Sequence, residues 1–202
     1  MTMLDSIQPR RIGHGSPVVL LHGVGESRQM WDGLAALADR HELISYDFRG
    51  HGEAAFEIED LSAQLEAMLA SNGITRAHIA GSSLGGMVAI HFAATWPNRV
   101  DRLVLCDTSP ALSEGMREDY LAAGDPARAA MARADLMDFA EEIFAATLVL
   151  CAEGADLALR EGADFLARSI PFGRFAFVPG AREDSVRERP NWVAQALLDF
   201  LT

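Results

Sequence analysis

The sequence predicts an α/β fold in which a mostly parallel sheet is covered by helices on both faces. Short apolar runs alternate with segments of helical periodicity along most of the 202 residues. The run at 17–21 is apolar on both sides, which is typical of a strand buried between two layers of helices. Half of the residues are hydrophobic, enough to fill one core. We therefore expect a single domain over residues 1–202, with about six strands joined by right-handed crossovers.

The first half of the chain provides the central strands and the helices between them. Leucine and methionine recur at helical spacing from 58 to 71, and Asn72-Gly73 follows as a stop signal. Gly-rich turns follow the strands. A ragged strand is expected at most near 10–12. The remaining predicted elements are strands at 17–21, 42–47 and from Ala77 into Gly81, and helices at 28–39, 58–71 and 84–95.

The alternation pauses once in the second half. Residues 111–145 are rich in alanine, arginine and acidic residues, and Asp125-Pro126 marks a helix start. Two short helices fit this segment best, as a small cap inserted between strands. The other predicted elements are strands at 102–106, 147–151 and 174–178 and helices at 159–169 and 189–201.

Composition limits the partners and the compartment. The net charge is −12, and every basic side chain other than histidine is arginine, so nucleic acid and anionic membranes are disfavoured as partners. No apolar run approaches the roughly 20 residues of a membrane span, and residues 1–8 do not read as a signal peptide. Cys106 and Cys151 each end a strand-like run, which favours buried reduced thiols in a cytoplasmic protein.

The chain is organised around the run Gly81-Ser82-Ser83-Leu84-Gly85. A short apolar run precedes it and a helical segment follows it, which is the context of a nucleophile elbow. The flanking glycines leave room for a tight strand-to-helix turn that holds Ser83 above the sheet. The N–H groups of Leu84 and Gly85 at the helix start would then point toward a developing oxyanion.

Five segments in this order resemble the α/β-hydrolase fold superfamily. The chain is similar to its small serine hydrolases, which include β-ketoadipate enol-lactonases and MenH-like esterases. Two regions are short by comparison, the strands before His22 and the cap at 111–145. The segments that carry the resemblance are 20–23, 46–52, 81–86, 99–105 and 197–201.

The resemblance implies a serine, an acid and a histidine in that chain order. Ser83 is then the nucleophile, and the oxyanion hole is formed by the backbone N–H groups of Leu84 and Val24. The family's acid position falls on Ala155, so the acid is either Asp156, one residue later, or Asp107 after the preceding strand.

The histidine of this pattern is replaced. The family motif Pro-Gly-x-Gly-His aligns with residues 179–183, which places Glu183 on the histidine, and no histidine follows His91. Loss of a triad member leaves only about 10³ to 10⁴-fold catalysis over water. Glu183 is a candidate base if burial or a neighbouring Asp156 or Asp107 raises its pKa. Such a carboxylate could also activate water or an acidic C–H.

The other histidines carry no predicted catalytic role. His22 and His51 belong to loops beside the predicted site, and their expected role is structural. None of the remaining histidines occupies the position of a base, and no cluster has the spacing of metal ligands. Trp31 is expected in the core. We thus expect no cofactor or metal, and we expect a hydrolase of a small carboxylic ester or lactone. The alternative is a catalytically degenerate member that binds a ligand or a partner.

Overall fold

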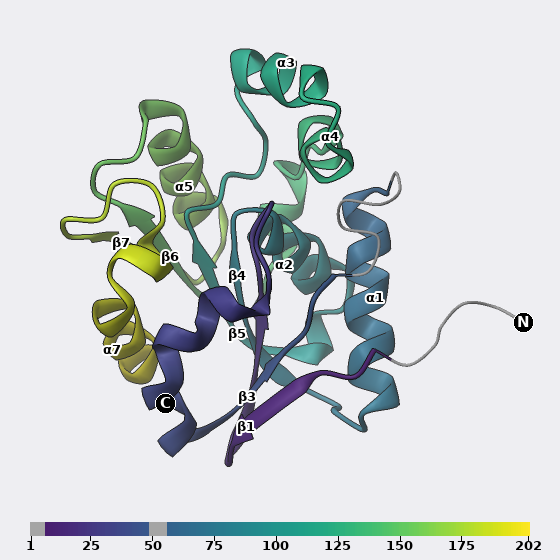
Figure 1. The fold of residues 1–202 in the computed structure, drawn as a ribbon, viewed down its shortest axis with the longest axis vertical. Coiled ribbons are helices and arrows are strands. Elements are labelled where there is room, and N and C mark those ends of the chain that lie inside the picture. Colours follow the sequence, from purple (N-terminus) through teal and green to yellow (C-terminus); the bar gives the residue numbers. More distant parts are fainter. Residues whose placement is uncertain (1–6, 49–55) are drawn as a thin grey trace, which may run out of the picture.

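The computed structural model describes residues 7–48 and 56–202, and the predicted loop position of His51 lies outside them. A seven-stranded sheet in the order β1-β3-β2-β4-β5-β6-β7 forms the centre of the protein (Figure 1). Every neighbouring pair is parallel except β1 and β3. The strands are β1 (Arg10–Gly13), β2 (Ser16–Leu21), β3 (His41–Ser45), β4 (Ala77–Ser82), β5 (Val100–Cys106), β6 (Ala146–Ala152) and β7 (Gly173–Val178).

The predicted mostly parallel α/β architecture is confirmed, and the number of strands is higher than expected. The segment near residues 10–12 forms a complete edge strand, in which Arg10 lies opposite Ser45 and Gly13 opposite Glu42. The ion pair between Arg11 and Glu42, 2.9 Å from Nε to Oε1, holds this edge across the two strands. Cross-strand pairing therefore forms a strand that the local pattern only suggested.

The helices lie on both sides of the sheet. α1 packs on α2, which in turn packs on β4 and β5, and α7 packs on η1. Figure 1 shows α7 and η1 on one side of the sheet and α1 and α2 on the other. The helices are η1 (Arg28–Asp39), α1 (Ile58–Ser71), α2 (Leu84–Thr95), η2 (Pro97–Arg99), α3 (Glu114–Ala122), α4 (Pro126–Arg133), η3 (Asp138–Glu142), α5 (Leu157–Ser169), α6 (Ser185–Glu188) and α7 (Pro190–Phe200).

Several predicted boundaries shift for identifiable reasons. The expected helix at 28–39 is a run of 3₁₀ turns with a break at Leu34. α5 begins at Leu157, two residues earlier than expected, because the Asp156 side chain caps it. The expected helix at 189–201 is preceded by the short helix α6, and α7 starts at Pro190, a residue suited to a first helical turn. The segment 111–145 contains α3, α4 and also η3.

The core lies on the central strands and α2. All six residues of β4 are buried, and so are ten of the twelve residues of α2. Trp31 is 3% exposed, which confirms its predicted place in the core. Cys106 and Cys151 are buried free thiols, also as predicted. Burial of apolar surface at about 25 cal/mol per Å² makes this layer the main source of stability.

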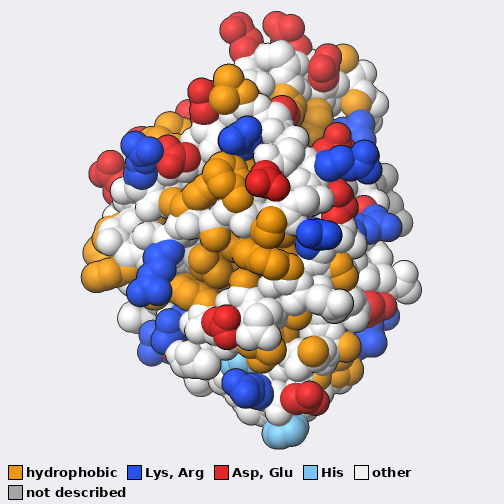
Figure 2. Space-filling view, turned by 90° about the vertical axis from the view of Figure 1, so that its left-hand side faces the viewer, with side chains coloured by type: hydrophobic (Ala, Val, Ile, Leu, Met, Phe, Trp, Pro, Cys, Tyr) orange, Lys and Arg blue, Asp and Glu red, His pale blue; other side chains and the backbone are white. Residues whose placement is uncertain are grey.

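The far edge of the sheet is formed by β7 and is partly apolar at its surface. Figure 2 shows hydrophobic side chains gathered in the middle of this side of the molecule, bordered by charged groups. Phe172 and Phe177 are among the exposed large hydrophobic residues, and Arg160 lies 5.0 Å from the ring centroid of Phe177. β7 is the last strand of the sheet, so exposed aromatic rings lie at an edge of the sheet.

Across the described residues, no helix is both long and apolar enough to cross a membrane.

Candidate active site

One pocket at the carboxyl ends of the parallel strands collects most of the predicted site residues. Val24 follows β2, Ser83 follows β4, Asp107 follows β5, Asp156 follows β6 and Glu183 follows β7. All five line a cavity of about 570 Å³. Parallel sheets bind their ligands at this edge, so the topology alone brings residues 159 positions apart into one pocket.

Ser83 has the backbone of a nucleophile elbow. Its φ is 50° and its ψ is −114°, a conformation that is rare and costly for any residue other than glycine. A Cβ at position 81 would lie 2.2 Å from the Gly85 carbonyl oxygen, and one at position 85 would lie 2.3 Å from the Leu21 oxygen. The glycines therefore have the steric role that the sequence predicted.

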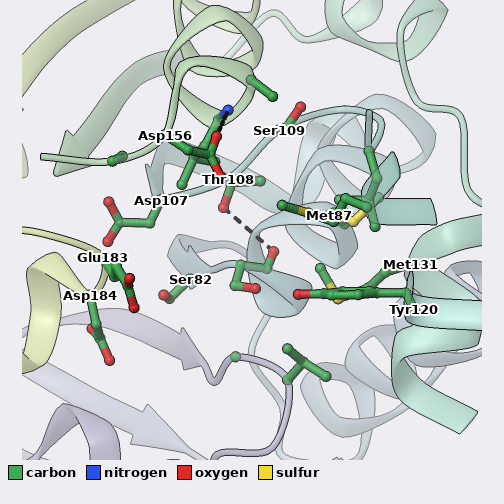
Figure 3. Close-up of a pocket in the computed structure, with 18 of the residues that line it drawn as sticks. Ser82, Met87, Asp107, Thr108, Ser109, Tyr120, Met131, Asp156, Glu183 and Asp184 are labelled. Carbon is green, nitrogen blue, oxygen red and sulfur yellow. Dashed lines mark hydrogen bonds between the residues drawn. The ribbon is translucent and has the colours of Figure 1, made fainter. Parts of the chain in front are cut away.

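A third glycine and Thr108 fix the helix against the strand ends. A Cβ at position 86 would lie 1.9 Å from Thr108 Oγ1 and 2.7 Å from Thr108 Cβ. The Thr108 hydroxyl donates to the Cys106 carbonyl oxygen at 2.9 Å and lies at the longer distance of 3.5 Å from the Ser83 carbonyl oxygen, the contact dashed in Figure 3. The loop after β5 thus supports the turn that carries Ser83.

The two residues whose backbone N–H groups are predicted to form the oxyanion hole both lie next to a residue of the pocket or in its lining. Leu84 is the first residue of α2, and Val24 lies in the loop after β2 and lines the pocket. Ser83 O accepts from the N–H groups of Gly86 at 3.0 Å and Met87 at 3.1 Å, which orients the first helical turn. Within the described part of the chain, no hydrogen-bond acceptor is found for the N–H of Val24 or of Leu84.

Asp107 is the buried carboxylate of the pocket. It is 6% exposed, has a φ of 47°, and accepts hydrogen bonds from Ala152 N at 2.7 Å, Ser185 N at 2.7 Å and Ser185 Oγ at 2.9 Å. Burial raises the pKa of Asp107 to about 6, and the bonds from Ser185 and Ala152 offset part of this effect. Asp184 adds to the increase in pKa through charge repulsion.

Asp156 and Glu183 reach the same pocket from exposed positions. Asp156 caps α5 and accepts a hydrogen bond from Leu159 N at 2.8 Å. The backbone N–H of Glu183 donates to Glu188 Oε1 at 2.9 Å, which orders the loop after β7. Ser185, two residues after Glu183, contacts Asp107, so the loop that carries Glu183 is tied to Asp107 rather than to Asp156.

The structure adds pocket residues that the sequence reasoning missed. Figure 3 shows Tyr120 and Met131 from the segment 111–145 facing the pocket, together with Met87. Asp184 lies beside Glu183 on the opposite side. Met116 and Tyr120 are four residues apart on α3, and this i,i+4 spacing in the predicted cap was a usable signal for one pocket-facing side.

His22, the described histidine next to the loop that carries Val24, has a structural position. His22 is buried, its Nε2 accepts from Phe48 N at 3.1 Å, and its Nδ1 lies 2.9 Å from Gly23 O. These two bonds fix the loop that carries Val24. Among the residues the structure describes, no histidine lines the pocket, and no group of three or more His, Cys, Asp or Glu side chains is placed to hold a metal ion.

Comparison with known proteins identifies the family. Residues 16–148 match the model of the alpha/beta hydrolase fold family. This chain therefore belongs to the alpha/beta hydrolase fold family, which agrees with the elbow and the mostly parallel sheet.

Individual relatives cover different shares of the chain. A pimeloyl-[acyl-carrier protein] methyl ester esterase of Pseudoalteromonas atlantica is 32% identical over 120 residues, covering 56% of this chain and 45% of that protein. An acetyltransferase component of an acetoin cleaving system of Pseudomonas putida is 37% identical over 113 residues, covering 53% and 30%. The chain thus spans less than half the length of these two curated relatives.

Solved structures match over almost the whole chain. The enol-lactonase of Burkholderia xenovorans superposes with a TM-score of 0.84 at 23% identity, covering 96% of both chains. A thermophilic esterase of Thermogutta terrifontis superposes with a TM-score of 0.85 at 24% identity, covering 96% of this chain and 92% of the esterase. At this level of identity the likeness establishes the fold.

Proposed function

We propose that this protein is a serine hydrolase of the esterase or enol-lactonase type, acting on a small carboxylic ester or lactone. The observation that carries the proposal is the strained backbone of Ser83 in the lining of the pocket, held by glycines that have no room for a side chain. Strain of this kind persists at functional sites because the surroundings over-determine it. The names of the esterase and enol-lactonase relatives support the reaction class.

The proposed reaction begins with attack of Ser83 Oγ on the carbonyl carbon. The serine proton passes to a carboxylate, and the N–H groups of Val24 and Leu84 stabilise the negative charge on the carbonyl oxygen. The tetrahedral intermediate collapses, the ester C–O bond breaks, and the carboxyl group returns the proton to the leaving oxygen. Water then cleaves the acyl-serine by the same route and releases the carboxylic acid.

Asp107 has better support than Asp156 as the carboxylate that works with Ser83. It is buried, and its pKa of about 6 is closer to the working range of a general base than that of an ordinary carboxylate. Asp156 is exposed and engaged in capping α5. Glu183 stays a candidate base because its side chain lines the same pocket from the position of the family histidine.

One observation favours a second function, a ligand-binding protein without hydrolytic turnover. Ser185 donates both its N–H and its hydroxyl to Asp107, so this carboxylate fixes the loop that carries Glu183. A pocket that retains its shape without an imidazole can bind a small ligand and leave it intact. We also propose a cytoplasmic location, which the buried free thiols of Cys106 and Cys151 support.

Labelling with a fluorophosphonate, measured by intact mass, tests the proposed function. We expect one adduct on the wild-type protein and none on Ser83→Ala. Ser62→Ala is the control, because Ser62 is a buried serine of α1 outside the pocket and its replacement should leave labelling unchanged. A wild-type protein that forms no adduct and hydrolyses no short-chain ester would contradict the proposal and favour the binding function. An activity that survives Ser83→Ala but not Glu183→Gln would instead indicate acid–base chemistry at Glu183.

A further inference from the structure

The pocket has two chemically different walls. Figure 3 shows Asp107, Glu183 and Asp184 on one side, which we term the acidic wall. Met87, Tyr120 and Met131 lie on the opposite side. Asp184 is close enough to Asp107 for its charge to raise the pKa of that carboxyl, so the members of the wall act on one another.

The three carboxylates of the acidic wall, Asp107, Glu183 and Asp184, take part in none of the ion pairs found among the described residues. Burial raises the pKa of Asp184, and Arg187, whose charge opposes this increase, is itself ion-paired with Glu26 at 2.6 Å. The described lining residues comprise five carboxylates and no arginine or histidine. The five are Glu26, Asp107, Asp156, Glu183 and Asp184.

We propose that the pocket selects a substrate that carries a protonated amine near its ester or lactone group, and that it disfavours substrates bearing a carboxylate. This inference rests on the proposed function and assigns its substrate class. An ammonium group would lie against the acidic wall, while the alkyl part of the substrate contacts the methionine and tyrosine side chains opposite. The cavity of about 570 Å³ has room for a short aminoacyl chain.

The physical reason is the electrostatic interaction energy, at short range in a partly desolvated pocket, between the wall carboxylates and the charged group of the substrate. At an effective dielectric constant of about 20, two unit charges a few ångströms apart interact strongly enough to change binding by at least tenfold. Selection should come from attraction of the ammonium and from repulsion of the carboxylate. Because both effects have the same origin, both should weaken as salt is added.

Three p-nitrophenyl esters of equal chain length provide the test: hexanoate, 6-aminohexanoate and the half ester of adipate. We expect kcat/KM to fall in the order ammonium, neutral, carboxylate, with a ratio on the order of 100-fold between the first and the last at low salt. In 0.5 M sodium chloride this ratio should shrink. Equal rates for the three esters, or a preference for the carboxylate, would overturn the inference while leaving the proposed function intact.

The chain offers matched variants for the acidic wall. Asp184 and Asp125 each cap a helix by accepting from the N–H three residues later, but only Asp184 lines the pocket. Asparagine also caps helices, so both substitutions preserve the cap. Asp184→Asn should reduce the ammonium-to-carboxylate ratio by about tenfold, and Asp125→Asn should leave it unchanged. Equal effects of the two variants would count against the acidic wall.

If no ester is hydrolysed, the proposed function fails and the substrate class is still testable by binding. Calorimetric titration of the Ser83→Ala protein with hexanamide, 6-aminohexanamide and adipamic acid compares the same three charges. Tighter binding of the ammonium compound supports the inference. Equal affinities, or no binding of any of the three, would refute it.

Discussion

At the scale of single residues, Ser83 combines the proposed chemistry with a measurable cost in stability. Its backbone lies in a region that costs of order 1–3 kcal/mol for a residue with a side chain. The neighbouring glycines and Thr108 hold the turn in this shape. The surrounding fold therefore offsets the strain energy of the Ser83 backbone, as is usual when function requires a strained position.

Replacing Ser83 by glycine should stabilise the protein. Glycine adopts positive φ freely, and this gain exceeds its larger loss of backbone entropy, so we expect the free energy of unfolding to rise by about 1 kcal/mol. Urea denaturation followed by circular dichroism measures the change. Ser83→Ala retains the Cβ and should show no such gain. A Ser83→Gly protein that is less stable than the alanine variant would contradict the strain account.

The site was predictable from sequence where its chemistry is set by a local motif. The glycines at 81 and 85 place Ser83, and the helix that starts at Leu84 follows from the same five residues. The catalytic carboxylate could not be chosen in this way. The candidates differ in burial, and burial depends on distant loops. Asp107 is buried by the loop at 185, and nothing in the sequence around 107 reports that contact. Asp184 was missed for the same reason, whereas the i,i+4 spacing of Met116 and Tyr120 is a local signal for pocket-facing residues.

At the scale of elements, α3 and α2 differ sharply in how they are held. None of the nine residues of α3 is buried, whereas ten of the twelve residues of α2 are. α3 contributes Met116 and Tyr120 to the pocket and packs mainly on α4. Local opening of a helix costs little when it buries little apolar surface.

Hydrogen exchange should separate these two helices. We expect the amides of α3 to exchange at least about 100-fold faster than those in the middle of α2, because α2 opens only with the sheet beneath it. Mass spectrometry of peptides covering 114–122 and 84–95 measures the difference. Equal protection of the two helices would show that the segment 111–145 is held more firmly than its burial indicates.

Elements with a strong hydrophobic periodicity were predicted closely, whereas elements that depend on tertiary contacts were not. Helix α1 begins and ends at the predicted residues because four apolar side chains recur on one face. The edge strand β1 depends on pairing with β3, which begins 31 residues after β1 begins, so its local sequence is a weak guide. The start of α5 is set by the Asp156 cap, although the sequence also predicts this aspartate as a candidate catalytic acid.

At the scale of the whole molecule, two buried groups give stability opposite dependences on pH. Burial lowers the pKa of His78 to about 4, so its contribution is present above its ordinary pKa near 6.5 and is lost as pH falls toward 4. Asp107 has a raised pKa of about 6, so its contribution is fully present below its ordinary pKa near 3.8 and is lost as pH rises through 6. Between pH 7.5 and 5 the two effects oppose each other. Burial also lowers the pKa of His41 and of His91, which adds to the loss in acid.

Replacing one of these two groups at a time should reveal the pH dependence of stability that the other group produces. From pH 7.5 to 5, His78 costs about 2 kcal/mol of unfolding free energy and Asp107 contributes about 1 kcal/mol in the opposite direction. His78→Phe should therefore lose less stability than the wild type on acidification, and Asp107→Asn should lose more. Urea titrations at the two pH values measure both. Parallel pH profiles for all three proteins would contradict the assigned pKa shifts.

The glycines at 81, 85 and 86 have a consequence for genetics. Each sits where a single added carbon would strike backbone or the Thr108 side chain. A mutational scan that scores only activity would rank these positions beside Ser83 and make a steric requirement look catalytic. Protein abundance, scored in the same library, would separate them: Ser83→Ala should accumulate normally, whereas alanine at any of the three glycines should deplete the protein itself.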